Sequence, residues 1–245
     1  MVNKFELAKE RLIVALDVDT DCRAEDLIKQ LAPYAGMFKV GMQLFYQAGP
    51  DLVRRLKQQG VKVFLDLKLH DIPNTVGQAA RALAELGTDM INVHASGGPE
   101  MMRAAATVVR ERAAALNLSV PLIISVTMLT SIDQHTFNHD LGIPGAIQEM
   151  VTRQAKLTKE AGLDGVVASP NEITVIREAC GKEFKIVTPG IRPAWSVAGD
   201  QKRIMTPAQA VRLGADYLVV GRPITAATDP PQAAHQILAE IAEVL

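Results

Sequence analysis

The alternation of two kinds of segment constrains the fold of this chain more than any other feature of its sequence. Short runs rich in β-branched residues are each followed by a longer segment with helical periodicity. The predicted strands are residues 12–16, 38–40, 61–65, 90–93, 122–126, 165–168, 185–188 and 217–220. The predicted helices are residues 24–32, 43–59, 75–86, 100–116, 146–161, 172–179, 207–213 and 232–244. Eight such units in 245 residues predict a parallel (β/α)8 TIM barrel, one domain over residues 1–245, with an open doubly wound sheet as the alternative.

Glycines mark the points where predicted helices end and the next strands begin. Gly87, Gly162 and Gly214 each stand two residues before an aspartate that opens a strand, and Gly60 is a looser fourth case. Glycine adopts the left-handed conformation of a helix C′ position without a steric cost. These glycines therefore predict short turns at the amino ends of the strands.

Composition and charge narrow the class of protein. Hydrophobic residues make up 48% and charged residues 22% of the chain, as in an ordinary globular protein. The net charge of −1 provides no basic field for nucleic acid or an anionic membrane. No run approaches the roughly 18 apolar residues of a membrane span, and the first residues do not form a signal peptide. Two cysteines give no disulfide framework, so we expect a soluble, cytoplasmic protein.

Residues 61–75 carry a concentration of charge that folding alone does not require. Strand alternation places Asp66 and Lys68 on one face, and Asp71 follows in the turn. Pro73 suits the first turn of the next helix. Two carboxylates thus flank one ammonium group where a buried strand ends. On spacing alone, Asp71 could equally be the N-cap of that helix.

Polar residues also follow the other predicted strands, at the end of a (β/α)8 barrel where active sites lie. Any one of them has a structural explanation, since Asp17 could be a turn residue and Lys39 could extend from an edge into solvent. Their convergence on one rim is harder to explain, because unpaired charges are costly to bury. The candidates are Asp17, Lys39, His94, Ser96, Thr127, Thr130, Arg192 and Arg222.

Two glycine-containing segments after the seventh and eighth predicted strands indicate a phosphate site. Barrels often bind phosphate with these two loops and a short helix N-terminus, and Arg222 would add paired donors. A pair of glycine turns with a surface arginine is the alternative. The two segments are Pro189-Gly190-Ile191-Arg192 and Gly221-Arg222-Pro223.

The loop of residues 189–206 is longer than is usual after a strand of such a barrel. It contains the only tryptophan, Trp195, and is predicted to form a mobile lid.

The sequence indicates neither a metal site nor a nucleotide cofactor. His135 and His139 have i, i+4 spacing, but no further ligands accompany them, and a solvated loop is the better interpretation. No glycine-rich dinucleotide fingerprint follows a strand, and no Walker loop is present. We therefore expect no metal and no cofactor.

Several motifs resemble those of the orotidine 5′-phosphate decarboxylase family, in particular its bacterial members. The most specific is Asp66-Leu67-Lys68-Leu69-His70-Asp71-Ile72-Pro73-Asn74-Thr75. Further matches run along most of the chain, from Val14-Ala15-Leu16-Asp17 and Lys39-Val40-Gly41 through Asn92-Val93-His94-Ala95-Ser96-Gly97-Gly98 to Gly221-Arg222-Pro223.

The resemblance implies decarboxylation of orotidine 5′-phosphate to UMP and CO₂, the last step of de novo UMP biosynthesis, without metal or cofactor. It implies a homodimer with active sites at the subunit interface. Lys68 would be the proton donor beside Asp66 and Lys39, and Asp71 and Thr75 would enter the neighbouring subunit's site. The substrate-binding residues that it implies are Asp17, Lys39, Asp66, Thr75, Thr130, Pro189, Arg192, Gln201, Gly221 and Arg222, with Asp17 and Lys39 at the ribose and the last four at the phosphate.

Two other functions stay open on the sequence. A related sugar-phosphate barrel, such as a keto-sugar-phosphate decarboxylase or an epimerase with a metal-stabilised enediolate, shares the Asp-x-Lys element, although Lys39 is an awkward neighbour for a cation. A non-catalytic binder of a phosphorylated ligand would not need two carboxylates around Lys68. We expect the decarboxylase, because the charge network can supply electrostatic stabilisation where no electron-sink cofactor is indicated.

Overall fold

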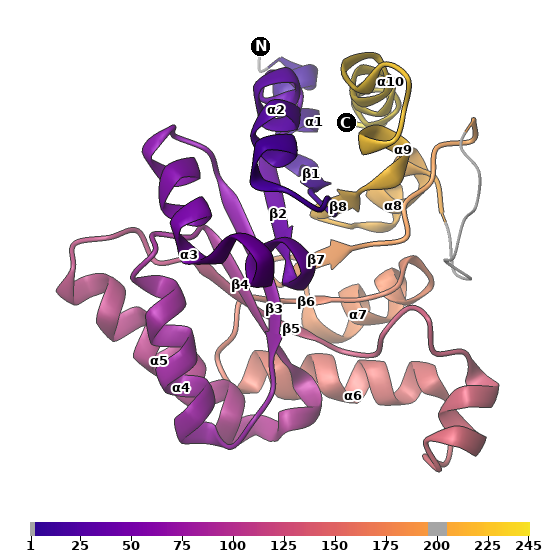
Figure 1. Ribbon diagram of the computed structural model, residues 1–245. Helices are drawn as coiled ribbons and strands as arrows, with labels where there is room; N and C mark the ends of the chain where they lie inside the picture. The colour runs from indigo at the N-terminus through magenta and orange to yellow at the C-terminus, as the bar shows by residue number, and fades with distance from the viewer. Residues whose placement is uncertain (1–2, 196–204) are drawn as a thin grey trace.

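Eight parallel strands close into a barrel in the part of the chain that the computed structural model describes, residues 3–195 and 205–245 (Figure 1). Each strand pairs with the next in the sequence, and β8 pairs with β1. The predicted (β/α)8 fold is confirmed, and the doubly wound alternative is wrong. The strands are β1 (Leu12–Ala15), β2 (Met37–Gly41), β3 (Val63–Leu69), β4 (Met90–His94), β5 (Leu122–Val126), β6 (Gly165–Val167), β7 (Lys185–Thr188) and β8 (Tyr217–Val220).

Helices surround the barrel and connect successive strands. Helices α1 and α10 pack against each other, so both ends of the chain lie on the same side of the molecule (Figure 1). The helices are α1 (Lys4–Arg11), α2 (Asp21–Leu31), α3 (Met42–Gln58), α4 (Pro73–Ala84), α5 (Gly98–Ala115), α6 (Ile147–Glu160), α7 (Ile173–Cys180), α8 (Pro207–Leu213), α9 (Arg222–Thr225) and α10 (Pro230–Ala242). Shorter turns are η1 (Ala95–Gly97), η2 (Thr136–Asp140) and η3 (Pro170–Glu172).

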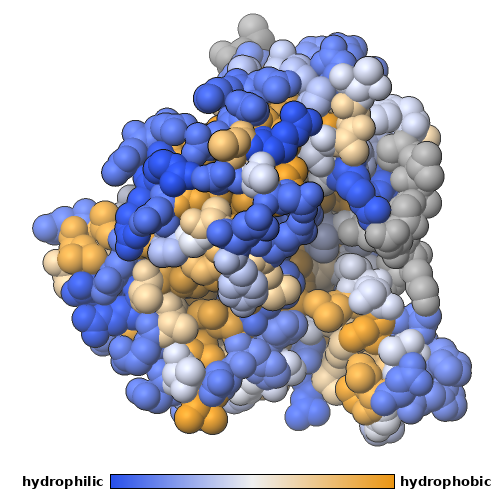
Figure 2. Space-filling view, viewed as in Figure 1, coloured by the Kyte–Doolittle hydropathy of each residue, from blue (hydrophilic) through white to orange (hydrophobic). Residues whose placement is uncertain are grey.

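Alternation along the strands divides the core into two layers. Along each strand, every second residue points outward and packs against the apolar faces of the helices. These strand and helix residues together form the larger layer. The view in Figure 2 shows a mostly hydrophilic surface outside these helices. Among the described residues, no helix has both the length and the apolar composition needed to cross a membrane. The smaller layer fills the barrel interior and consists of Ile13, Ala15, Met37, Phe64, Met90, Ile124, Val187 and Val219.

The turns at the amino ends of the strands repeat one arrangement. The predicted glycine turns are confirmed, because Gly60, Gly87, Gly162 and Gly214 have φ angles of 75°, 70°, 84° and 106°. An aspartate then precedes each of β4, β6 and β8 and accepts a backbone N–H at the start of the strand before it. These bonds join Asp89 to Val63 at 2.7 Å, Asp164 to Ile123 at 2.7 Å and Asp216 to Ile186 at 2.9 Å. The carboxylates thereby fix the register at the bottom of the barrel.

Some elements differ from those predicted. Helix α1 was not predicted, because only Ala8 of its residues is buried and its sequence has little apolar periodicity. Helix α3 is not continuous, since Gly49 has a φ of 68° and Pro50 restarts the helix. The predicted solvated loop around His135 and His139 contains the π-helical turn η2, which is anchored by buried Phe137.

We predict that Gly165→Ala destabilises the barrel. A Cβ at Gly165 would lie 2.2 Å from the carbonyl oxygen of Lys185, so the backbone of β6 or β7 would have to move. Overpacking of this kind lowers the free energy of unfolding by about 1–3 kcal/mol, which urea unfolding can measure.

Gly77→Ala is the matched control. Gly77 lies inside α4, where a Cβ would make only an ordinary contact with Val108 at 3.6 Å. Alanine there should raise the free energy of unfolding by about 0.5–1 kcal/mol. Equal effects of the two substitutions would contradict the packing of β6 against β7.

Candidate active site

Four charged side chains form an alternating chain at the carboxyl end of the barrel. The ammonium of Lys39 lies 3.0 Å from a carboxylate oxygen of Asp17 and 3.5 Å from Asp66. The ammonium of Lys68 lies 2.6 Å from the other oxygen of Asp66. Lys39 and Asp66 are buried, whereas Asp17 is exposed and Lys68 is half-buried. The predicted proximity of Asp66 and Lys68 is confirmed, and Lys39 joins them.

Asp66 stays ionised in spite of its burial. Burial alone would raise the pKa of its carboxyl group, but the positive charges of Lys39 and Lys68 outweigh that effect. Hydrogen bonds from Lys68 and Asn92 lower the pKa further, so that it lies below its ordinary value. The buried carboxylate of Asp66 therefore lies between two ammonium groups, one from Lys39 and one from Lys68.

The backbone at Lys68 departs from the regular strand that alternation predicts. Its φ angle is 54°, a left-handed conformation that costs a non-glycine residue roughly 1–3 kcal/mol. The pairing of β3 with β4 passes from Leu65 opposite Ile91 to Leu69 opposite Val93. The β3 residues between these pairs, Asp66 to Lys68, thus bulge opposite one residue of β4.

A cavity of about 180 Å³ opens beside this charge network. Lys39, Asp66 and Lys68 form its charged wall, and two further predicted substrate-binding residues, Thr130 and Pro189, also line it. The remaining lining is mostly apolar: Phe64, Val126, Met128, Leu129, Val167, Ala168 and Val219. Such a small number of polar groups in an apolar pocket is typical of a ligand site.

The predicted phosphate residues follow β7 and β8, as expected. Gly221 precedes α9 and lies against Asp17, since a Cβ there would be 3.6 Å from the carboxylate. Arg222 is the exposed first residue of α9, whereas Arg192 is buried and donates to the carbonyl of Ile191 at 3.1 Å.

The predicted lid, residues 189–206, is described only at its ends. These ends are joined by backbone hydrogen bonds between Arg192 and Met205 at 3.0 Å and between Met205 and Gly190 at 3.4 Å. Trp195 is 47% exposed. Gln201, a predicted phosphate residue, lies outside the described residues.

Asp71 and Thr75 do not reach the cavity of their own chain. Both side chains are exposed, at the point where β3 gives way to α4. The alternative that Asp71 caps α4 is wrong, because the N-cap is Ile72 and no side chain caps the helix. Pro73 occupies the first turn, as predicted.

Asn92 belongs to the site but was not predicted as a functional residue. Its amide nitrogen donates to Asp66 at 2.6 Å, and its amide oxygen accepts the backbone N–H of Lys68 at 2.8 Å. It is fully buried in β4. The signal in the sequence was a lone amide inside an otherwise apolar strand, which must be hydrogen-bonded when buried.

Of the remaining polar candidates, one is buried and hydrogen-bonded within the barrel, and the others are exposed. Thr127 is buried and donates to the carbonyl of Val167 at 3.1 Å, which is a structural role, and Ser96 is exposed. His135 and His139 are exposed, with ring centroids 4.5 Å apart. Among the described residues, no group of three or more His, Cys, Asp or Glu side chains could hold a metal ion.

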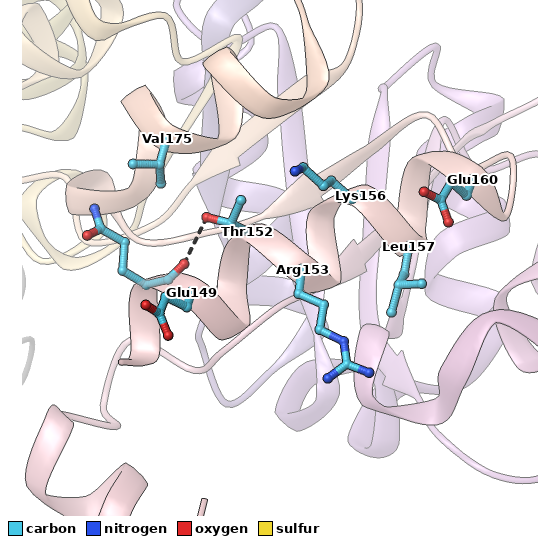
Figure 3. Close-up of a pocket in the computed structure, with 8 residues that line it drawn as sticks. Glu149, Thr152, Arg153, Lys156, Leu157, Glu160 and Val175 are labelled. Atoms are coloured by element: carbon cyan, nitrogen blue, oxygen red, sulfur yellow. Dashed lines mark hydrogen bonds between the residues drawn. The ribbon is translucent and has the colours of Figure 1, made fainter. Parts of the chain in front are cut away.

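A larger hollow of about 580 Å³ lies on the outside of the barrel along α6. Figure 3 shows its side chains spread along the helix, without a point on which charged groups converge. Thr152 donates to the carbonyl of Gln148 in its own helix at 2.8 Å (Figure 3). This groove lacks the buried charges of the barrel mouth, so we place the active site at the mouth.

Comparison with known proteins agrees with the motifs. The model of the orotidine 5′-phosphate decarboxylase / HUMPS family matches residues 10–237. The chain belongs to this family. The resemblance of the motifs to orotidine 5′-phosphate decarboxylases is thus confirmed.

Individual relatives of the orotidine 5′-phosphate decarboxylase family match nearly the whole chain. The orotidine 5′-phosphate decarboxylase of Moorella thermoacetica is 61% identical over 234 residues, which cover 96% of this chain and 93% of that protein. That of Syntrophomonas wolfei is 53% identical and covers 96% and 99%. The crystal structure of the Lactobacillus acidophilus enzyme superposes with a TM-score of 0.84 at 42% identity, over 94% of this chain and 98% of that one.

We predict that His94 makes stability depend on pH. Burial, and then the charges of His70 and Lys68, lower the pKa of His94, with Asp66 acting in the opposite sense. The unfolded chain therefore takes up a proton on this residue at a higher pH than the folded one. Its stabilising contribution is complete above an unfolded pKa of about 6.5 and is lost as the pH falls toward the lower folded pKa.

Urea unfolding of the wild type and His94→Asn at pH 7.5 and 5.5 measures this contribution. The free energy of unfolding should fall more in the wild type than in the variant between the two pH values. An equal fall in both proteins would show that His94 is not buried as a neutral group.

Proposed function

We propose that the charge network at the barrel mouth decarboxylates orotidine 5′-phosphate to UMP and CO₂, with Lys68 as the proton donor to C6. The observation that carries the proposal is the buried carboxylate of Asp66 between the ammonium groups of Lys39 and Lys68, at 3.5 and 2.6 Å, on the wall of an apolar cavity. Membership of the family supports the substrate.

Loss of CO₂ from C6 leaves an electron pair on a carbon with no internal acceptor. Fixed charges in a site of low polarity can stabilise such an anion strongly, because they need not reorient during the reaction. The Lys68 ammonium provides that charge and then transfers its proton to C6. Asp66 stays ionised at neutral pH, since its pKa is lowered, and its negative charge holds the Lys68 amine at 2.6 Å.

The other predicted residues supply binding at a distance from C6. In this proposal Asp17 and Lys39 contact the ribose, and Thr130 and Pro189 contact the base side of the cavity. The phosphate is held after β7 and β8 by Arg192, Gln201, Gly221 and Arg222. Binding energy from a remote phosphate can stabilise the closed, reactive complex, so it should raise kcat as well as affinity.

We further propose that the chain is a single-domain cytoplasmic protein. Its two cysteines are free, Cys180 in the core and Cys22 at the surface. Free thiols are typical of a reducing compartment, which supports a cytoplasmic setting.

The loss of orotidine 5′-phosphate absorbance on addition of the purified protein, with and without EDTA, tests the function. We expect turnover that EDTA does not change. Turnover lost in EDTA would favour the sugar-phosphate type of metal chemistry, and binding without turnover would favour a non-catalytic protein.

In the same assay Lys68→Ala should lose turnover while it still binds UMP. The reason is that this substitution removes the proton donor but leaves the phosphate contacts. Lys62→Ala is the matched control, because Lys62 is exposed and lies just before β3, at the opposite end of the strand. Near-normal turnover by Lys68→Ala would contradict the assignment of the proton donor.

We propose that the active enzyme is a homodimer in which Asp71 and Thr75 enter the partner's site. All residues from His70 to Thr75 are exposed, including Ile72 at 66%. Met42 and Tyr46, on the helix after β2, are also exposed, at 44% and 73%. Apolar and aromatic side chains are enriched in the centre of protein interfaces, which supports an interface at this end of the barrel.

Mixing two inactive variants tests the shared site. Lys68→Ala and Asp71→Ala should each be inactive, but a heterodimer of the two would keep one site with both wild-type groups. Random exchange of equal amounts should therefore restore about a quarter of wild-type activity, because half of the dimers are mixed and each has one intact site.

The matched control is a mixture of Lys68→Ala with Asp66→Ala. These two residues belong to the same chain's site, so no mixed dimer has an intact site and activity should stay absent. Restored activity in the control, or none in the test mixture, would contradict the proposed exchange of Asp71.

A further inference from the structure

A single side chain, Asn92, holds both members of the catalytic pair. Its amide nitrogen donates to Asp66 at 2.6 Å, and its amide oxygen accepts the backbone N–H of Lys68 at 2.8 Å. The side chain is fully buried, and its position on β4 lies opposite the bulge of β3. One planar group thus fixes the carboxylate of one residue and the backbone of the other.

The bulge makes this support necessary. Three residues of β3, Asp66 to Lys68, lie opposite the single residue Asn92, so the regular ladder of backbone bonds is interrupted there. Lys68 has a left-handed φ of 54°, which is unfavourable without a compensating interaction. The amide oxygen of Asn92 replaces the missing ladder acceptor.

Few side chains could do both tasks. A carboxamide carries a donor and an acceptor on two separate atoms in one plane, whereas a carboxylate only accepts and a hydroxyl donates and accepts through a single oxygen. The amide of Asn92 and the ammonium of Lys68 both donate to the same oxygen of Asp66, Oδ1, each at 2.6 Å. The second oxygen faces Lys39 at 3.5 Å.

We propose that Asn92 is a positioning residue that holds Lys68 and Asp66 in the geometry required for proton transfer. It does not touch the substrate in this proposal and acts through these two residues. The inference rests on the proposed decarboxylase function and adds to it a residue outside the charged chain.

Kinetics provide the first test. Asn92→Ala should lower kcat by about 10- to 100-fold, which is the value of one hydrogen bond to a charged group. The KM for orotidine 5′-phosphate should change by less than about threefold, because the phosphate contacts remain.

The pH profile separates positioning from a general loss of structure. The charged or titratable groups around Asp66 are Lys39 on β2, Lys68 on β3 and His94 on β4, with Asp17 behind Lys39. Loss of the Asn92 donor should move the acidic limb of the kcat/KM profile to higher pH. Asn92→Asp, which has the same shape, should move it further, because two adjacent carboxylates resist joint ionisation.

Hydrogen exchange of the Lys68 backbone amide provides a readout that does not depend on activity. The amide should exchange about 10- to 100-fold faster in Asn92→Ala, which lacks the acceptor. It should stay protected in Asn92→Asp, which keeps an acceptor oxygen. This variant also serves if Asn92→Ala fails to fold.

Ser125→Ala is the matched control. Ser125 is fully buried on β5, pairs in register with Val93, and shares a hydrogen bond of 2.6 Å with Thr158 of α6. Its removal costs a buried hydrogen bond on the helix side of the sheet, so stability should fall while kcat, the acidic limb and Lys68 exchange stay unchanged.

These experiments distinguish a failure of the proposed function from a failure of the proposed role of Asn92. A wild type that does not consume orotidine 5′-phosphate would overturn the proposed function, and the exchange measurement would still test the support of Lys68. Wild-type values of kcat and the acidic limb in the Asn92 variants, or unchanged Lys68 exchange in Asn92→Ala, would overturn the role of Asn92.

Discussion

The carboxylate of Asp66, buried between two ammonium groups, is the interaction on which the rest of the site depends. Burial alone would raise the pKa of this carboxyl group, and the positive charges of Lys39 and Lys68 outweigh that effect. The ammonium of Lys68 lies 2.6 Å from this carboxylate and that of Lys39 lies 3.5 Å from it. The site thereby holds the proposed proton donor, Lys68, against an ionised carboxylate beside an apolar cavity, which suits a reaction that builds negative charge on carbon.

The barrel provides the rigidity that this arrangement needs. Lys39, Asp66 and Asn92 come from three adjacent strands, β2, β3 and β4, whose paired backbones fix their separation. At the opposite end, aspartates at the starts of the strands fix the register. The bulge at Lys68 interrupts the regular pairing of β3 with β4 and lies where the chemistry is proposed, as is common for strained residues in active sites.

The sequence predicts most of the fold and part of the site, for different physical reasons. Hydrophobic periodicity and turn glycines depend on local chemistry, so the eight strands were predicted to within a few residues. Helix α1 escaped prediction because it buries only Ala8, and the break at Gly49 was hidden by the helical periodicity on both sides.

The site shows the limits of strand alternation. Alternation correctly brings Asp66 and Lys68 together, although the positive φ of Lys68 shows that the backbone between them is not a regular strand. Asn92 stands out in the sequence only as a lone amide in an apolar strand, and its two partners could not be identified because they lie 26 and 24 positions away. The role proposed for Asp71 depends on a second subunit, which no pattern within one chain can reveal.

The exchange of the C6 proton of UMP with deuterated water, followed by proton NMR, tests the central claim most directly. If Lys68 gives a proton to C6, it must also remove that proton from the product in the reverse direction, with Asp66 holding the same charge network. The C6 signal should disappear with the wild type and with Lys62→Ala, and it should persist with Lys68→Ala. Equal loss of the signal with Lys68→Ala would show that another group moves this proton and would contradict the account.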